Sequence, residues 1–259
     1  MKQKIFVITV NYNNGNLTSD CLKSFAVLDT TGIDINLVVV DNDSTEEASQ
    51  LLEKKTKNVK FLYSKINLGF AGGNNIGINY ALKNNADYVL LINNDATVED
   101  KDFFQKMLDT KGDIVSPLVK YRHEGKLTYD YGGKVDYLFG RNTHINKKSD
   151  YSPDYYSGVC LLIKTSVFKE VGGLDDGFFL YYEDTDFCLK AKKLGFSLKF
   201  CPSVSIFHHL SMSANKLGKK KLIILANSHL RFCSCHLPIV SAPLYLSFNL
   251  YLRLKTLFL

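Results

Sequence analysis

The sequence has no paired-cysteine motif. Its six cysteines include no C-x-x-C pair and follow no regular spacing; they are Cys21, Cys160, Cys188, Cys201, Cys233 and Cys235. Zinc sites and disulfide frameworks need such spacing, so the pattern argues against both and favours reduced thiols. A dinucleotide-binding G-x-G-x-x-G fingerprint is also absent. No segment of roughly 20 to 50 residues repeats, which argues against a solenoid.

Long uncharged runs are missing too. The first apolar run, residues 5–10, is short and has no small-residue cleavage pattern, so it is expected to be a buried strand of an unsecreted protein. The longest uncharged run, residues 237–252, contains Pro238 and Pro243. Because a spanning helix needs about 20 apolar residues, no transmembrane segment is expected. We therefore expect a cytoplasmic protein.

The composition is that of a globular protein, with 46% hydrophobic and 22% charged residues among 259. The formal net charge of +6 is concentrated locally, because Lys216 and Lys219 to Lys221 precede the apolar C-terminal tail. This is a local patch and does not indicate a nucleic-acid surface. The length suits one large domain, or one domain with an appendage.

Short apolar runs alternate with segments of helical character over the first hundred residues. The expected strands cover 5–10, 35–40, 59–63 and 88–92, and the expected helices 17–28, 46–54 and 73–84. Such alternation predicts an α/β fold with a mostly parallel, Rossmann-like sheet flanked by helices. Residues 111–156 are expected to form loops and short antiparallel strands. A further strand and a short helix ending at Gly172 should follow.

The predicted strand ends are polar, and open α/β sheets bind ligands beyond the carboxyl ends of their strands. Asp41 ends the second strand, where it could form an Asx-turn or accept a hydrogen bond from a nucleotide base. The glycine-rich stretch 67–77 could approach a phosphate or form a flexible turn. Asp95 could be a turn residue or bind Mg²⁺ or Mn²⁺ beside a diphosphate. His208 could join that metal or be an ordinary histidine.

A second cluster is the acidic and aromatic stretch "FFLYYEDTDFCLKAKKLGF", residues 178–196. It places Glu183, Asp184 and Asp186 at the expected start of a helix, where acids complement the helix dipole. Interaction with the helix dipole explains one acid at this position well, but three acids less well. Neighbouring aromatic side chains would partly desolvate a carboxylate and raise its pKa, as a general base near neutrality requires.

These motifs together resemble family 2 glycosyltransferases of the GT-A fold, in the branch of rhamnosyltransferase-like enzymes of bacterial surface-polysaccharide assembly. The likeness covers about residues 5–213 and consists of six motifs in order: "VITVNYN", "VVVDNDS", "NLGFAGGNNIGI", "YVLLINNDATV", "SGVCLLIKTSVFKEVGGLDDGFFLYYEDTDFCLKAKKLGF" and "PSVSIFHH". The resemblance implies an inverting, metal-dependent transfer from a UDP- or dTDP-linked sugar to a glycan or polyprenyl-linked acceptor.

The resemblance also implies a role for each candidate. Asp184 would be the catalytic base and Glu183 would help to position the acceptor. Asp95 would bind Mg²⁺ or Mn²⁺ as the acid of a D-x-D-type motif, with His208 as a further ligand, although Asn93 stands where an Asp could be. Contacts to the nucleotide-sugar would come from Asp41, Asn67, Gly73, Asn74 and Asn94.

The expected domains are a GT-A domain over 1–213 and a basic, then apolar, extension over 214–259. Lysines followed by Leu, Phe and Tyr suit a segment at a membrane interface, which would make the protein peripheral on the inner face of the membrane. The extension could instead pack on the catalytic domain or on a second subunit. The sequence does not indicate the oligomeric state.

Two other functions stay open. A sugar-nucleotide nucleotidyltransferase shares the sheet and the metal-binding acids, but would carry a basic glycine-rich loop where this chain has "NYNNGN". A non-catalytic sugar-nucleotide-binding relative would be expected to have lost the base or the metal-binding acid, yet both are present.

Overall fold

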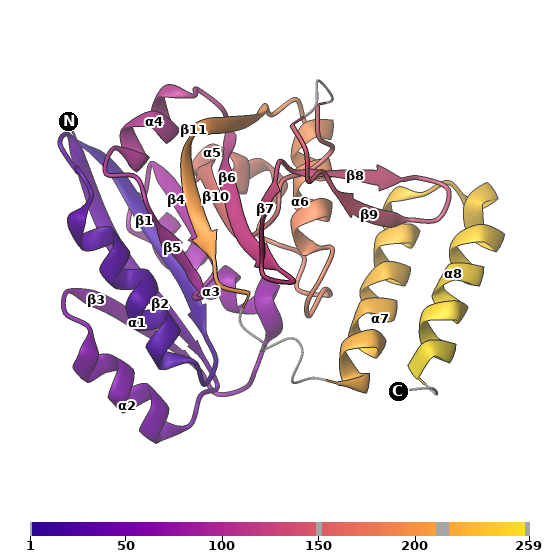
Figure 1. Cartoon of the computed structure of the whole chain (residues 1–259), viewed down its shortest axis with the longest axis horizontal. Helices are drawn as coiled ribbons and strands as arrows, with labels where there is room; N and C mark the ends of the chain where they lie inside the picture. The colour runs from indigo at the N-terminus through magenta and orange to yellow at the C-terminus, as the bar shows by residue number, and fades with distance from the viewer. Residues whose placement is uncertain (1, 149–151, 211–217, 257–259) are drawn as a thin grey trace.

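A central mixed β-sheet with helices on both faces forms the body of the protein (Figure 1). The computed structural model describes residues 2–148, 152–210 and 218–256. The nine strands of the sheet are β1 (Gln3–Asn11), β2 (Ile33–Asn42), β3 (Val59–Ser64), β4 (Tyr88–Ile92), β5 (Ala96–Val98), β6 (Ile114–His123), β7 (Lys126–Asp130), β10 (Cys160–Lys164) and β11 (Leu198–His208). Their order is β3-β2-β1-β4-β10-β6-β11-β5, and β7 pairs with β6.

The amino-terminal half of the sheet is parallel, as the sequence predicts. Strands β3, β2, β1 and β4 pair in parallel through their Val- and Ile-rich segments, and the helices between them are α1 (Gly15–Ser24), α2 (Glu46–Lys55) and α3 (Gly69–Lys83). The start predicted for the third helix is wrong by four residues. The glycines at 69, 72 and 73 lie inside α3 rather than in a loop before it.

The second half of the sheet departs from parallel pairing. Strand β10 runs antiparallel to both β4 and β6. The prediction for residues 111–156 missed β6, a ten-residue strand that pairs in parallel with β11. The predicted short antiparallel strands are found in β7 and in the hairpin of β8 (Gly133–Asp136) and β9 (Arg141–His144). The predicted helix before Gly172 is α5 (Thr165–Val171).

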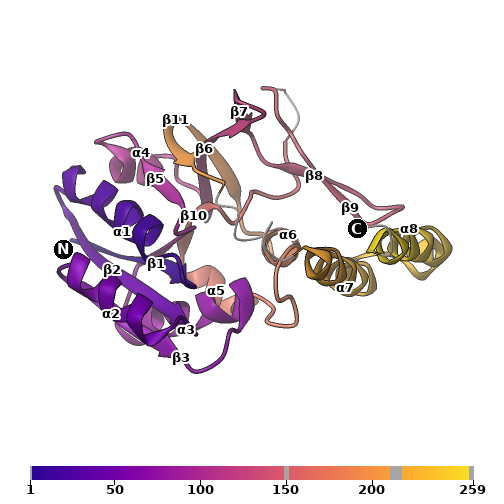
Figure 2. The ribbon, with the colours of Figure 1, turned by 60° about the horizontal axis from the view of Figure 1, so that its bottom comes forward.

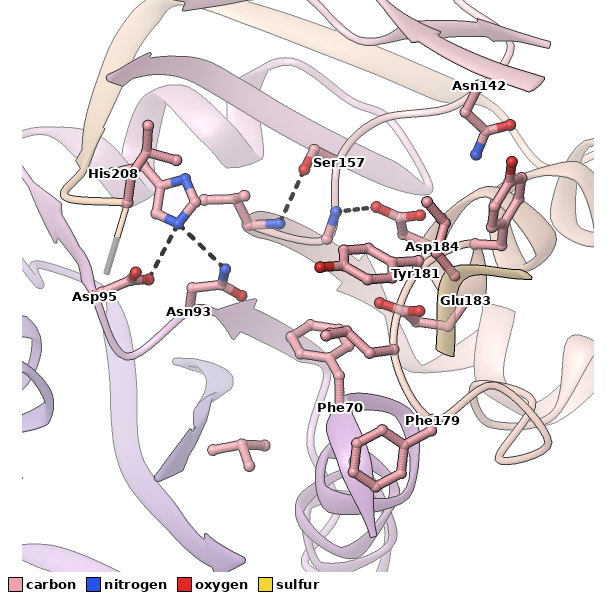
Figure 3. A pocket seen from close by; sticks show the side chains of 18 of the residues that line it. Phe70, Asn93, Asp95, Asn142, Ser157, Phe179, Tyr181, Glu183, Asp184 and His208 are labelled. Carbon is pink, nitrogen blue, oxygen red and sulfur yellow. Dashed lines mark hydrogen bonds and ion pairs between the residues drawn. The ribbon is translucent and has the colours of Figure 1, made fainter. Parts of the chain in front are cut away.

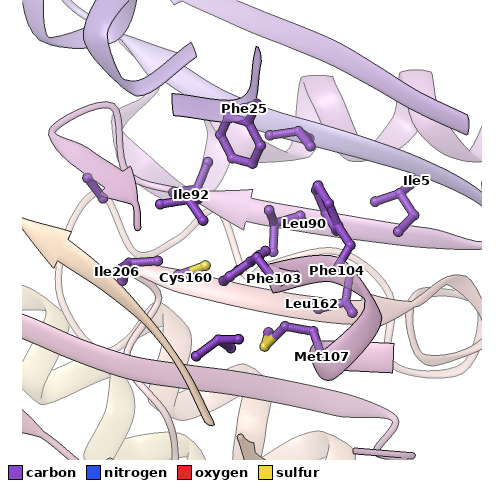
Figure 4. Packing of buried hydrophobic residues seen from close by; sticks show 14 of the residues in the cluster. Ile5, Phe25, Leu90, Ile92, Phe103, Phe104, Met107, Cys160, Leu162 and Ile206 are labelled. Carbon is purple, nitrogen blue, oxygen red and sulfur yellow. The ribbon is translucent and has the colours of Figure 1, made fainter. Parts of the chain in front are cut away.

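Two apolar clusters fill the two faces of the sheet. One face packs against α1 and α4 (Phe103–Asp109), with Phe103, Phe104 and Met107 fully buried against Leu90 and Leu162 (Figure 4). The other face packs against α3, α5 and α6 (Glu183–Lys193). Burial on both faces explains why these strands read as continuous apolar runs.

Helix α3 approaches β1 very closely. A Cβ atom placed on Gly77 would overlap Cγ2 of Ile8, and one placed on Gly73 would lie 2.9 Å from Cγ1 of Val10. Both positions therefore need glycine for helix-to-sheet packing. This packing fixes where the amino-terminal end of α3 meets the ends of the strands.

The last two helices form a hairpin beside α6, at the end of the molecule away from the chain's amino terminus (Figures 1 and 2). Helix α7 (Lys219–His236) packs on α6, and α8 (Ala242–Lys255) packs on α7. Phe232 and Tyr182 form the centre of the contact, with ring centroids 5.0 Å apart. His236 Nε2 also lies 2.7 Å from Oδ1 of the buried Asp186. The domain boundary predicted at 213/214, and Lys216, lie outside the described residues.

Candidate active site

A cavity of about 1080 Å³ opens at the carboxyl ends of β1, β2 and β4. Its wall near the sheet contains mainly polar side chains: Tyr12, Asn14, Asn42 and Asn67. Farther along, α6 and the β8–β9 hairpin form the wall, and the two C-terminal helices close the far end. Figure 3 shows Asp95 and His208 on one side, facing Glu183 and Asp184 on the other.

Asp95 and His208 form a pair on the sheet side of the cavity. Asp95 lies in the turn between β4 and β5, and His208 is the last residue of β11, so antiparallel pairing of β11 with β5 brings them together. Oδ1 of Asp95 lies 3.1 Å from Nε2 of His208, and both side chains are largely buried. The structure thus brings the two predicted metal ligands together.

This donor set fits a divalent cation shared with a substrate. Mg²⁺ is commonly held by one or two carboxylates together with phosphate oxygens and water, and imidazole is an accepted ligand of Mn²⁺. The described residues contain no cluster of three or more His, Cys, Asp or Glu side chains that could hold a metal alone. Oδ1 of Asn93 is buried beside the pair without a hydrogen-bond partner among the described residues. Asp95, His208 and a diphosphate would together provide the ligands.

Asp184 faces the cavity from the first turn of α6. Its Oδ2 accepts a hydrogen bond from the backbone N–H of Gly158 at 2.8 Å, and its Oδ1 accepts from the backbone and hydroxyl of Thr185. Burial raises the pKa of Asp184, and these hydrogen bonds oppose the rise. The direction is the one that the sequence predicts for a carboxylate at this position. A fixed, partly desolvated carboxylate of this kind can accept a proton from a hydroxyl group.

Glu183 is the more desolvated of the two acids. Burial raises its pKa well above the usual range, and the charge of Asp184 raises it further. Its Oε2 is buried and has no hydrogen-bond partner among the described residues. Glu183 therefore holds its proton to higher pH than an exposed glutamate.

The backbone before these acids is strained. Tyr181 and Tyr182 both have left-handed φ angles, 72° and 71°. For residues other than glycine this conformation costs about 1 to 2 kcal/mol each, and it persists only where packing enforces it. Tyr182 packs on Phe232 of α7, whereas Tyr181 points into the cavity (Figure 3). The turn thus directs the ring of Tyr182 toward Phe232 in the C-terminal core and the ring of Tyr181 into the cavity.

The predicted base-binding residue, Asp41, does not line the cavity. It is 3% exposed and accepts hydrogen bonds from Asn11, Ser44 and Ser49. These contacts fix the loops that carry Tyr12 and Asn14 to the cavity wall. A direct contact of Asp41 with a nucleotide base stays a prediction.

The other predicted substrate-binding residues divide into two groups. Asn67 and Asn94 line the cavity. The Asn67 Oδ1 accepts from Asn42 Nδ2 and from the backbone of Gly69, which fixes its amide. Gly73 and Asn74 are buried behind the wall in α3, where Asn74 donates to the carbonyl of Phe70. Their contact with a nucleotide-sugar stays a prediction.

Several cavity residues were missed by the sequence analysis. Asn142, His144 and Tyr155 come from the poorly patterned segment between β7 and β10, and Phe248 and Leu252 from the tail. No motif marks the first three. The only signal in the sequence for this segment is its richness in tyrosine and polar residues, which does not indicate which side chains point inward.

The chain belongs to glycosyl transferase family 2, whose sequence profile matches residues 6–172. This confirms the resemblance inferred from the motifs. The solved structures that share its fold support the predicted GT-A fold, so the protein is a GT-A member of glycosyl transferase family 2.

Three curated relatives illustrate the branch. The chain is 30% identical over 186 residues to the low-salt glycan biosynthesis hexosyltransferase Agl10 of Haloferax volcanii, covering 66% of this chain and 58% of the relative. It is 31% identical over 160 residues to the rhamnosyltransferase WbbL of Escherichia coli, covering 54% and 61%. It is 25% identical over 253 residues to an N-acetylglucosaminyl-diphospho-decaprenol L-rhamnosyltransferase of Mycobacterium tuberculosis, covering 86% and 80%. The chain thus spans about three-fifths of the length of the first two.

Two solved structures share the fold. One is GalNAc-T7 with UDP, GalNAc and Mn²⁺, with a TM-score of 0.65 at 14% identity over 80% of this chain and 44% of that chain. The other is residues 1–349 of TarS from S. aureus in complex with UDP, with a TM-score of 0.59 at 20% identity over 88% and 65%.

Proposed function

We propose that this protein transfers a sugar from a nucleoside-diphosphate sugar to a glycan or lipid-linked acceptor, with inversion at the anomeric carbon. The observation that carries the proposal is the arrangement of one cavity: a half-buried carboxylate, Asp184, faces the Asp95–His208 pair from the opposite wall. A base on one side and a diphosphate site on the other are what a single displacement requires. Membership of family 2 supports the same chemistry.

In the proposed reaction, the Asp184 carboxylate accepts the proton of an acceptor hydroxyl. The acceptor oxygen forms a bond to the anomeric carbon while the bond from that carbon to the diphosphate oxygen breaks. Hydrogen bonds from Gly158 and Thr185 keep the carboxylate oriented throughout. Asp95 and His208 would hold a divalent cation, which when bound neutralises charge on the departing diphosphate.

A UDP- or dTDP-linked donor fits the polar end of the cavity. The side chains of Tyr12 and Asn67 line that end, with the Asn67 amide held by Asn42, and such groups can bind a pyrimidine base and ribose. The names of the relatives point to rhamnose or another hexose as the sugar. The nucleotidyltransferase alternative is not favoured, because the relatives are named as sugar transferases.

The acceptor is proposed to be linked to a lipid diphosphate. Beyond Asp184 the cavity wall changes to Leu225, Phe248 and Leu252 of the C-terminal helices, with Arg141 and Lys221 at the same end. Apolar side chains beside cations suit a diphosphate followed by a hydrocarbon chain. The mycobacterial relative is named for an acceptor of that chemistry.

Peripheral binding to a membrane would bring such an acceptor to the cavity. Helix α8 exposes Leu246, Leu250, Tyr251 and Leu254, and the turn before it exposes Ile239 and Val240 to about 80%. Lys219, Lys220 and Arg253 lie on the same hairpin, which suits anionic lipid. Among the described residues, no helix is both long enough and apolar enough to cross a bilayer.

The Asp184→Asn variant tests the assignment of the base. Purified protein would be given Mn²⁺ or Mg²⁺, a panel of dTDP-rhamnose, UDP-glucose, UDP-galactose and UDP-N-acetylglucosamine, and phytanyl diphosphate carrying N-acetylglucosamine as acceptor. The wild type should release nucleoside diphosphate and form a glycosylated lipid. The variant should bind donor normally and lose about 10²- to 10⁴-fold in transfer rate, because general-base catalysis contributes that much.

The exposed Asp176 provides the control, since Asp176→Asn removes the same charge outside the cavity. It should transfer at the wild-type rate. A loss below tenfold for Asp184→Asn would rule out Asp184 as the base. Release of pyrophosphate from a nucleoside triphosphate would instead identify a nucleotidyltransferase.

A further inference from the structure

A carboxylate–imidazole pair on the cavity wall has no part in the proposed reaction so far. Nδ1 of His144, the last residue of β9, lies 2.9 Å from Oδ2 of Asp130, the last residue of β7. Both residues line the cavity. The Asp130 side chain is 7% exposed and that of His144 is 49% exposed, so the acid lies inside the fold and the imidazole ring is accessible.

The position of the His144 ring is fixed from several sides. Oδ1 of Asp130 accepts a hydrogen bond from the backbone N–H of Gly132 at 2.8 Å, which orients the other oxygen toward His144. An ionised carboxylate only accepts hydrogen bonds, so Nδ1 carries a proton and donates it to this bond. The ring also packs edge-on against Tyr155, with centroids 6.0 Å apart. Backbone hydrogen bonds of Ile145 hold the end of β9 against the turn after β7.

Strand β9 brings His144 to the wall that carries the base. Nδ2 of Asn142 donates to Oγ1 of Thr185 at 2.7 Å, and that hydroxyl donates in turn to Oδ1 of Asp184. Residues two apart in a strand point to the same side, so His144 faces the same wall as Asn142. In Figure 3, Asn142 lies on the Asp184 side of the cavity, away from the two predicted metal ligands.

The charges of His144 and Asp184 act on each other. The hydrogen bond from Asp130 raises the pKa of His144 although burial opposes the rise, and the charges of Asp130 and Asp184 raise it further. Burial raises the pKa of Asp184, and the charge of His144 opposes that rise. The imidazole is therefore a cation throughout the pH range in which Asp184 loses its proton.

Other titratable side chains on the surrounding elements do not supply this charge. Burial raises the pKa of Tyr121 on β6 and of Tyr155 before β10, so both are neutral near pH 7. Lys134 on β8 lies 3.4 Å from a carboxylate oxygen of Asp154 and is neutralised by it. The positive charge that acts on the base from this wall is that of His144.

We infer that His144, held by Asp130, is a positioning residue that acts on the reaction through Asp184, because its imidazolium stabilises the carboxylate form of the base. The inference rests on the proposed function. A protonated carboxyl group cannot accept the proton of an acceptor hydroxyl, and a nearby cation favours the ionised form. In the described part of the chain, His144 forms its ion pair with Asp130 and none with Asp184, so the charge does not cover the base.

His144→Gln tests the inference, because it removes the charge and keeps a polar side chain. Transfer would be measured with the donor that the wild type uses and with phytanyl diphosphate carrying N-acetylglucosamine as acceptor. The acidic limb of the kcat/KM profile should move upward by about 0.5 to 1 pH unit. His144→Lys keeps a cation beside Asp130 and should restore the wild-type limb. The control is His123→Gln, an exposed histidine outside the cavity, which should match the wild type.

A titration of the His144 ring by NMR tests the same coupling without any substrate. Coupling between two sites is reciprocal, so Asp184→Asn should lower the pKa of His144. An unchanged pKa of His144 overturns the inference. So does a His144→Gln variant that is slower at every pH but keeps the wild-type limb, since that result indicates a structural role. A wild-type protein that transfers no sugar contradicts the proposed function itself, and the inference with it.

Discussion

At the scale of single residues, the protonation of Asp184 is set by opposing contacts. Burial raises its pKa, whereas hydrogen bonds from Gly158 and Thr185 lower it, with a further contribution from the charge of His144. The folded protein thus binds this proton more tightly than the unfolded chain. The associated stability is complete below the unfolded pKa and is lost as the pH rises through the folded pKa. Activity should show the opposite trend, because the base must be deprotonated.

Thr185→Val should therefore move the acidic limb of the pH-rate profile upward. The substitution removes the hydroxyl hydrogen bond that stabilises the Asp184 carboxylate and leaves the side-chain volume nearly unchanged. Transfer rates measured from about pH 5 to 9 should show the limb at higher pH than in the wild type. Thr165→Val is the control, because Thr165 donates to the carbonyl of Asp87 instead. An acidic limb at the wild-type pH would show that the Thr185 hydroxyl does not stabilise the carboxylate of Asp184.

Asp95→Asn should weaken both donor binding and transfer. The carboxylate of Asp95 lies beside His208, and an amide in its place is a poorer ligand for Mg²⁺ or Mn²⁺. Calorimetry should show that EDTA weakens donor binding by the wild type and that added Mn²⁺ restores it, while the variant responds little to either. Donor binding by the wild type that is unaffected by EDTA would contradict the metal assignment.

At the scale of elements, α3 shows why a glycine-rich stretch need not be a phosphate loop. Gly73 and Gly77 let the helix lie against Val10 and Ile8 of β1. This contact holds the start of α3 beside Asn42 and Asn67, which line the cavity. The glycines therefore act on the site through packing.

Gly77→Ala should lower the free energy of unfolding by about 1 to 3 kcal/mol, the usual cost of overpacking, despite the better helix propensity of alanine. Chemical denaturation would measure it. The conflict is with Cγ2 of Ile8, which leucine lacks, so the double variant with Ile8→Leu should lose less than the sum of the two single losses. If the losses of the two single variants add in the double variant, the Cβ at position 77 does not conflict with Cγ2 of Ile8, and the prediction is wrong.

At the scale of the whole molecule, the C-terminal hairpin belongs to the site as well as to the surface. Its inner side closes the cavity with Leu225 and Phe248 and is tied to α6 by the contact of His236 with Asp186. Its outer side exposes the apolar residues of α8. A membrane bound to that outer side would therefore lie one helical layer from the acceptor end of the cavity.

Replacing Ile239, Leu250 and Tyr251 by serine should reduce binding to vesicles that contain phosphatidylglycerol at least severalfold. These side chains are 80%, 57% and 55% exposed, so their loss removes apolar contact with lipid and little internal packing. Co-sedimentation would measure the effect. The control is the double variant Val27→Ser, Ile66→Ser. These side chains are 65% and 63% exposed and lie outside the C-terminal hairpin. Equal sedimentation of all three proteins would remove the membrane proposal.

The sequence by itself determined the parallel half of the sheet, the helices that alternate with it, and the family. Those features depend on local periodicity and on short motifs, such as the Val-rich run before Asp41. The tertiary structure decided what depends on contacts between distant residues: the parallel pairing of β6 with β11, the turning of Asp186 to His236 while Asp184 faces the cavity, and the burial of the Tyr155 hydroxyl. Desolvation and partnership arise only when segments far apart in the chain meet, so no local pattern encodes them.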